Sequence, residues 1–216
     1  MKKQSKWLLA GIFCVLFLAL IALVRRADVA AIGPEGTSIG LSHLNAAVRD
    51  ALGVRMFWYD ITELLGALAI LVAGVFALTG LWQLIRRRSL FKVDRGIWAL
   101  AALYVAVIAL YVFFEKVIIN YRPILMPGCD APEASFPSSH TMLVCTILGS
   151  AAMQAKYYIK NASLRGAVPI VCAVLIGVTV LGRLLSGVHW FTDILGGVLI
   201  SVALLAAFSA LAEEKK

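Results

Sequence analysis

Two of the three histidines in the sequence stand in short polar segments that interrupt long apolar runs. His189 lies four residues before Asp193, at the point where an apolar run begins. Residues four apart share one face of a helix, so the carboxylate can hold one ring N–H and leave the other nitrogen free as a nucleophile. We therefore predict that His189 is a nucleophile oriented by Asp193, although such a pair could also be a helix-capping ion pair.

A second polar segment, Pro137-Ser138-Ser139-His140, precedes another apolar run. Pro137 suits the first turn of a helix, where the backbone N–H groups of the following residues point outward and can bind an anion. The His140 imidazole titrates near neutral pH and would donate a proton to a leaving oxygen beside that anion. Taken alone the segment resembles a helix cap, but together with His189 it predicts a general acid.

Two arginines complete the predicted site. Arg183 precedes the histidine–aspartate pair, and Arg122 precedes Pro123, which disfavours helical geometry at the arginine and places it in a loop. Their planar guanidinium groups can bind phosphate oxygens and, with helix-end N–H groups, stabilise phosphoryl transfer without a metal. No carboxylate cluster has the pattern of a metal cage, so we predict no metal and no cofactor. Asp130 and Glu133 are expected to shape the outer loop or contact a headgroup.

The elements that must position these residues are membrane-spanning helices. The chain has 216 residues, of which 62% are hydrophobic and 15% charged, and its apolar runs approach or exceed the roughly 20 residues that cross a bilayer. We predict one all-α domain over residues 1–216, a bundle of six transmembrane helices. Their expected limits are Trp7 to Val24, Phe57 to Ile85, Ile97 to Ile119, Thr141 to Ala155, Gly166 to Leu185, and Trp190 to Ala212.

The net charge of +8 does not indicate a nucleic-acid partner, because most of the 20 lysines and arginines fall in alternate loops between the apolar runs. Their distribution indicates how the chain is oriented in the membrane. This distribution predicts that both termini are cytoplasmic and that the site lies on the extracytoplasmic side of a bacterial cell membrane. The first apolar run could instead be a signal sequence. Against this, Arg25 and Arg26 separate it from the small residues Ala30 and Ala31 that a cleavage site would need.

The first outer loop contains a short predicted amphipathic helix. Residues 41–52 place apolar side chains at helical spacing opposite polar ones, and Gly53 stands where the helix would end. Such a helix fits the membrane interface. We expect it to cap the bundle, and the alternative is that it shapes the access of lipid to the site.

In order and spacing, the polar segments resemble the motifs of the type 2 phosphatidic acid phosphatase family over about residues 95–205. The family has three motifs on a six-span helical core. In the first, six residues separate a Lys from Arg-Pro, and the second is Pro-Ser-Gly-His. In the third, Ser-Arg is followed after five residues by His, and three further residues separate that His from an Asp. The resemblance implies these roles: His189 as the phosphorylated nucleophile, Asp193 as its partner, His140 as the general acid, and a phosphate clamp of Arg122, Arg183 and the Ser139 backbone. Ser138, at the same helix start, and Lys116 are further candidates for binding phosphate.

Three features depart from the family pattern. Gly182 replaces the serine before the arginine, Ser139 replaces the glycine of the second motif, and only five residues separate Lys116 from Arg122. On a helix continuing through this segment, Glu115 rather than Lys116 would face the same way as Arg122. Either the helix end unwinds and Lys116 still reaches phosphate, or the site relies on two arginines, one of them held in place by Glu115.

The predicted function is hydrolysis of a lipid phosphate monoester or diphosphate through a phosphohistidine intermediate. Undecaprenyl diphosphate is the first expected substrate, and phosphatidylglycerophosphate or phosphatidate is the alternative. The sequence does not choose between them, because phosphate-binding motifs do not distinguish the lipid tail or headgroup. The retained histidines argue against a catalytically silent lipid-binding protein, and a transporter would need more polar residues near the midplane. The related vanadium-dependent haloperoxidases share such motifs but are soluble. Expected partners are the lipid substrate and membrane lipids, without nucleic acid or an obligatory protein partner.

Overall fold

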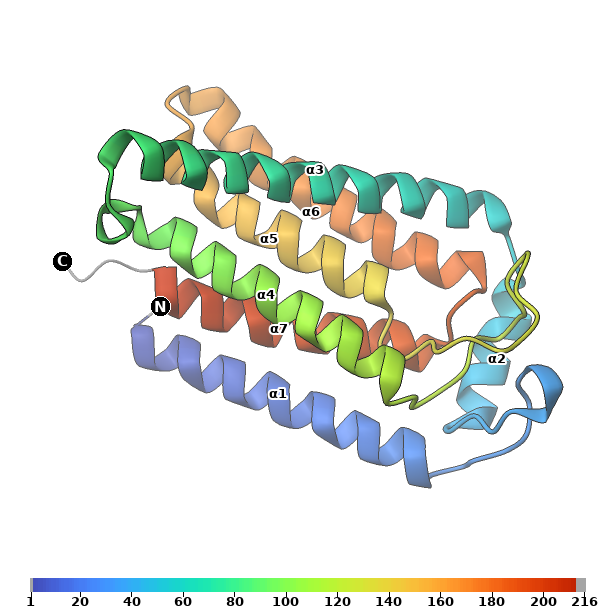
Figure 1. The fold of residues 1–216 in the computed structure, drawn as a ribbon. Coiled ribbons are helices and arrows are strands. Elements are labelled where there is room, and N and C mark those ends of the chain that lie inside the picture. The colour runs from blue at the N-terminus through green and yellow to red at the C-terminus, as the bar shows by residue number, and fades with distance from the viewer. Residues whose placement is uncertain (1, 213–216) are drawn as a thin grey trace.

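The computed structural model describes residues 2–212, and within this range the chain is helical without a β-strand, which confirms the all-α prediction (Figure 1). Two isolated bridges, between Ala30 and Ile39 and between Tyr121 and Ala134, order the loops at one end. The helices are α1 (Lys3–Arg26), α2 (Ser42–Leu52), α3 (Met56–Arg87), α4 (Arg95–Lys116), α5 (Ser139–Tyr158), α6 (Ala162–Ser186) and α7 (Phe191–Ala212), with short 3-10 turns at Pro34–Gly36 and Leu90–Lys92.

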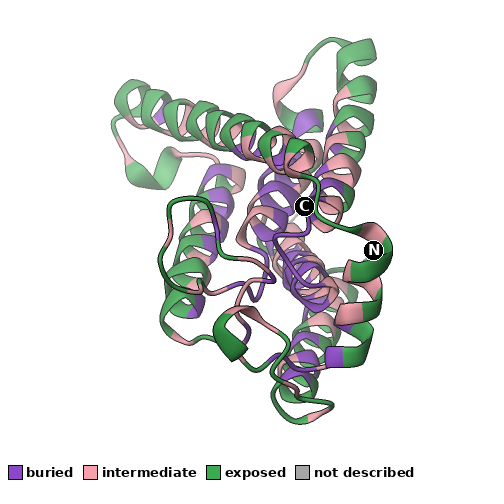
Figure 2. Ribbon diagram, turned by 90° about the vertical axis from the view of Figure 1, so that its right-hand side faces the viewer, coloured by how far each residue is buried: buried purple, intermediate pink, exposed green. Residues whose placement is uncertain are grey.

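Helix α5 lies at the centre of the bundle, where it packs against α3, α4, α6 and α7, while α1 packs along α7. Buried residues accordingly concentrate in the central helices, and the outer faces of the surrounding helices are exposed (Figure 2). Because α5 faces protein on most sides, it carries buried polar residues whose hydroxyls bond back to the helix. Thr146 Oγ1 donates to the Met142 carbonyl at 2.7 Å, and Ser150 Oγ donates to the Ile147 carbonyl at 2.9 Å.

Five helices, α1, α3, α4, α6 and α7, are long and apolar enough to cross a membrane within the described residues. The chain is therefore an integral membrane protein. The segment expected as the fourth span coincides with α5, whose enclosed polar side chains lower its hydropathy below that of its neighbours. Lipid does not need to solvate α5, so its composition resembles a buried helix of a globular core.

The aromatic core near the site links three helices to the loop before α5. Phe17 of α1 stacks on Phe136 with ring centroids 5.8 Å apart and meets Phe114 of α4 edge-on at 5.8 Å. The Phe136 ring also lies against Gly196 of α7, where an added Cβ would come within 2.7 Å of it. This packing fixes the chain directly before Pro137 and hence the start of α5.

Helix α2 forms over residues 42–52, as the amphipathic pattern predicts, and Gly53 caps its C-terminus with a φ of 70°. At its N-terminus the Asp28 carboxylate accepts from the Ser42 hydroxyl and the His43 backbone N–H. Buried Asn45 donates to Thr192 Oγ1 at 3.0 Å and accepts from the Thr192 backbone N–H at 3.2 Å. Helix α2 is therefore attached directly to the first turn of α7.

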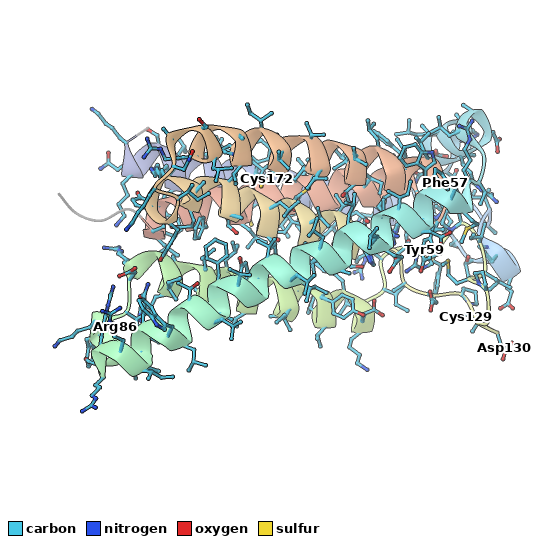
Figure 3. The ribbon with its side chains drawn as sticks, turned by 90° about the horizontal axis from the view of Figure 1, so that it is seen from above. Phe57, Tyr59, Arg86, Cys129, Asp130 and Cys172 are labelled. Atoms are coloured by element: carbon cyan, nitrogen blue, oxygen red, sulfur yellow. The ribbon has the colours of Figure 1, made fainter. Side chains whose placement is uncertain are left out.

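The two ends of the bundle carry different features. Helix α1 begins and α7 ends at one end, together with the α3–α4 and α5–α6 connections, whereas α2 and the α4–α5 loop lie at the other. In Figure 3, Arg86 marks the first end, and Tyr59, Cys129 and Asp130 lie at the opposite end. The loops carrying most of the lysines and arginines are therefore separated from the predicted site by the length of the bundle.

This arrangement gives a topology prediction. A reporter enzyme inserted near Lys92 and one fused after α7 are expected to report the cytoplasm, because positively charged loops are retained there. A reporter inserted near Asp130 is expected to report the opposite side. Detection of the Lys92 and Asp130 reporters on the same side would contradict the orientation.

Candidate active site

Arg183 lies at the centre of the site with 1% of its surface exposed, at a point where α3, α5, α6 and the α6–α7 loop meet. Its NH1 atom donates to Thr62 Oγ1 at 3.2 Å and to Glu63 Oε1 at 3.0 Å. Its NH2 atom lies 3.3 Å from His140 Nδ1 and 3.3 Å from His189 Nε2. The guanidinium carbon lies 5.1 Å from the centre of the Tyr59 ring. The buried charge is thus surrounded by a carboxylate, two histidines, a hydroxyl and an aromatic face.

The close approach of α6 to α3 explains why Gly182 stands where the family motif has serine. A Cβ atom at this position would lie 2.8 Å from Thr62 Cγ2 and 3.2 Å from a ring carbon of Trp58. Glycine therefore permits the helix contact that brings Arg183 within reach of Thr62 and Glu63.

His189 follows Gly187, whose φ of 71° ends α6 and turns the chain toward α7. The His189 side chain is buried, and its Nδ1 lies 3.8 Å from Asp193 Oδ2. That carboxylate oxygen accepts the Trp190 backbone N–H at 2.9 Å, so it is held in place beside the ring. Since Nδ1 faces Asp193, Nε2 is the nitrogen directed toward Arg183, as the predicted nucleophile requires.

The electrostatic surroundings of His189 favour the neutral ring. Burial, reinforced by the guanidinium groups of Arg183 and Arg122, lowers the pKa of His189 well below its usual value of 6.5. A neutral imidazole keeps the Nε2 lone pair available at neutral pH, which is the protonation state of a nucleophile.

Two residues that sequence reasoning missed flank the Asp193 carboxylate. The side chains of Asn120 and Ser135, both buried, lie near it and favour its charged form. The same residues are joined through the backbone, where Ser135 N donates to the Asn120 carbonyl at 3.0 Å. Their only signal in the sequence is polarity next to apolar residues, which does not indicate that they meet Asp193.

The start of α5 gives the neighbouring serines different tasks. Ser138 is the N-cap residue, its hydroxyl accepts from the Thr141 backbone N–H, and its own N–H donates to the Asp193 carbonyl at 3.0 Å. Ser139 lines a cavity together with His189 and Arg122, at a helix position whose N–H has no intrahelical acceptor. The backbone N–H available for an anion is therefore that of Ser139, while Ser138 connects α5 to α7.

The residues of the first predicted motif, Glu115, Lys116 and Arg122, do not lie on one continuous helix. The helix ends at Lys116, shorter than the expected limit at Ile119, so the helical register proposed between Glu115 and Arg122 does not apply. Arg122 pairs with Glu133 of the outer loop, with Nε 3.0 Å from Oε2. Glu115 lines the cavity with Arg122, whereas Lys116 is exposed and is not among the lining residues. The carboxylate partners of the two arginines are Glu133 and Glu63, in place of Glu115.

Glu63 is a further site residue that the sequence analysis did not identify. Its Oε1 atom lies 3.1 Å from His140 Nε2 as well as 3.0 Å from Arg183 NH1. Tyr59, Thr62, Glu63 and Gly66 recur at helical spacing, so they form one face of α3 toward the site. At Gly66 an added Cβ would lie 2.9 Å from the His140 ring, and this face therefore packs directly on the histidine.

These features are those expected of a membrane enzyme for phosphoryl transfer. The sequence profile of the PAP2 superfamily matches residues 96–216, more than half of the chain. The chain therefore belongs to the PAP2 superfamily, in agreement with its resemblance to the type 2 phosphatidic acid phosphatases, and it is a lipid phosphatase.

A solved structure has a similar fold. It is the crystal structure of the first transmembrane PAP2 type phosphatidylglycerolphosphate phosphatase from Bacillus subtilis, which aligns with a TM-score of 0.63 and 20% sequence identity over 94% of each chain. Among curated protein sequences, none matches this chain.

The lowered pKa of His189 generates a prediction for the titration of its ring in the substrate-free protein. The ring is expected to stay neutral at pH 6.5 and to take up a proton only well below that pH. Nitrogen NMR of the ¹⁵N-labelled histidines at a series of pH values tests it, with His189→Ala used to assign the signal. A midpoint at or above pH 6.5 would contradict the buried, neutral ring.

A second prediction concerns the first motif. Lys116→Ala is expected to change kcat/KM by less than about threefold, because the lysine is exposed at the end of α4. Glu133→Gln is expected to raise KM roughly threefold, because it loosens Arg122. Both are measured in the same phosphate-release assay, beside Glu115→Gln. A large loss of activity in the lysine variant would place Lys116 in the clamp after all.

Proposed function

We propose that this chain hydrolyses a lipid phosphate ester or diphosphate without a metal, through a phosphohistidine on His189. The observation that carries the proposal is the convergence of His189 Nε2 and His140 Nδ1 on the same guanidinium nitrogen of Arg183, each at 3.3 Å. A phosphoryl group bound to Arg183 between the two rings would meet a nucleophile and a proton donor at once.

The reaction follows from these positions. The His189 Nε2 lone pair attacks phosphorus, the bond from phosphorus to the leaving oxygen breaks, and that oxygen takes a proton from His140. Water then attacks the phosphohistidine, neutral His140 accepts its proton, and cleavage of the P–N bond releases phosphate. Arg183, Arg122 and the Ser139 backbone N–H stabilise the charge on the phosphoryl oxygens, and Asp193 stabilises the His189 ring as it becomes cationic.

The site favours a substrate presented at the membrane surface. The cavity is lined by exposed Tyr111 and Glu115 at the end of α4 and by Arg122 of the outer loop, so it opens where headgroups would lie. Undecaprenyl diphosphate remains the first candidate, and phosphatidylglycerophosphate is supported as the alternative by the name of the similar solved structure. Phosphatidate shares the same phosphate chemistry. Phosphate release from these three lipids by purified protein ranks them directly.

The proposed topology has six spans, with α5 as the enclosed sixth beside the five apolar helices. Both ends of the chain would then be cytoplasmic in a bacterial cell membrane, and the site extracytoplasmic. In Figure 1 the long helices alternate in direction, and α7 ends at the same end of the bundle at which α1 begins, which supports an even number of crossings. Helix α2 would lie along the outer interface, where its amphipathic pattern fits.

The chemical prediction is that turnover persists in a metal chelator and is blocked by vanadate, which adopts the geometry of the transferring group. His189→Ala is expected to abolish turnover together with acid-labile labelling by a lipid carrying ³²P. Asp60→Asn, which removes an exposed carboxylate from α3, serves as a control and is expected to retain labelling. Phosphate trapped on a residue other than His189 would overturn the assignment.

A further inference from the structure

Glu63, which contacts His140, lies outside the motifs that identify the family. The family profile begins at residue 96, whereas Glu63 belongs to α3, residues 56–87. One carboxylate oxygen, Oε1, reaches both His140 Nε2 at 3.1 Å and Arg183 NH1 at 3.0 Å. The side chain retains 39% of its exposure, so the carboxylate is also reached by solvent.

The two histidines of the site have matching surroundings. His189 directs Nδ1 toward Asp193 and Nε2 toward Arg183, while His140 directs Nε2 toward Glu63 and Nδ1 toward Arg183. Each ring therefore has one nitrogen beside a carboxylate and the other facing the phosphate position. A carboxylate in this position fixes the ring orientation and stabilises its cationic form.

We propose that Glu63 is the positioning residue of the general acid, so that His140 delivers its proton from Nδ1 while Nε2–H stays bonded to Glu63. The inference rests on the proposed phosphohistidine mechanism and adds the partner and the reacting atom of His140. In the first step the Nδ1 proton moves to the leaving oxygen as the P–O bond breaks. In the second step Nδ1 takes a proton from the attacking water, which restores the imidazolium beside Glu63.

A second reading of the same contacts is that Glu63 serves only to hold Arg183. The two roles differ in their dependence on the leaving group. A misplaced Arg183 weakens phosphate binding for every substrate alike, whereas an impaired general acid affects only leaving oxygens that are too basic to depart without a proton.

The experiment compares Glu63→Gln with wild type on dodecyl phosphate, which leaves as an alkoxide, and on p-nitrophenyl phosphate, which leaves as a stable phenolate. Glutamine keeps a hydrogen-bond acceptor for Nε2–H but removes the charge. We expect kcat to fall roughly tenfold to a hundredfold for dodecyl phosphate and less than about threefold for p-nitrophenyl phosphate. Glu63→Asp, which keeps the charge, is expected to recover part of the loss, and Asp60→Asn is the matched control on the same helix.

A double-mutant cycle identifies the partner through which Glu63 acts. In the His140→Ala background, Glu63→Gln is expected to cause no further loss on dodecyl phosphate, because the ring it positions is absent. An equal loss on both substrates, or a full additional loss without the His140 ring, would overturn the inference. Activity of Glu63→Gln on p-nitrophenyl phosphate shows that this variant is folded. If Glu63→Gln is inactive on both substrates, the two substrates are compared with Glu63→Asp instead. Failure of wild type to label His189 would instead contradict the proposed function.

Discussion

A buried arginine sets the main constraint on this structure. An uncompensated guanidinium in the interior costs several kcal/mol, so Arg183 requires partners from every element around it. Thr62 and Glu63 come from α3, His140 from α5 and His189 from the loop before α7. The same contacts that satisfy the charge bring together the ring nitrogens of His140 and His189, the proposed acid and nucleophile. The packing of Arg183 and the proposed chemistry therefore depend on the same contacts, which the absence of a side chain at Gly182 permits.

The clustering of the candidate site residues could be predicted because their spacing in the sequence reflects local geometry. His189 and Asp193 lie within one turn of each other at the start of α7, and Ser138 to His140 form the start of α5, so short segments contain most of the information. The long apolar runs likewise predicted the positions of the helices. Helix α5 was the least apolar of them, because it is solvated by its neighbours rather than by lipid.

Partners that are distant in the chain could not be predicted in the same way. Glu63 precedes His140 by more than seventy residues, and no spacing rule joins them. Asn120 and Ser135 reach Asp193 only because an irregular loop folds back on itself. Glu115 and Arg122 would share a helix face only if α4 continued to Arg122, but α4 ends at Lys116, and Arg122 pairs with Glu133. Charges in loops are paired by three-dimensional proximity, which local sequence does not encode.

The attachment of α2 to the first turn of α7 fixes the position of α2 relative to His189 and Asp193. Asn45 holds Thr192, the residue before Asp193, and Arg49 lies over the ring of Trp190, the residue after His189. If α2 lies among the headgroups, as proposed, the depth at which it settles also sets the depth of His189, the proposed nucleophile. The distance from the lipid surface to the phosphorus atom would then select the substrate: a phosphate on a short, membrane-anchored headgroup would arrive at His189, whatever lipid tail carries it.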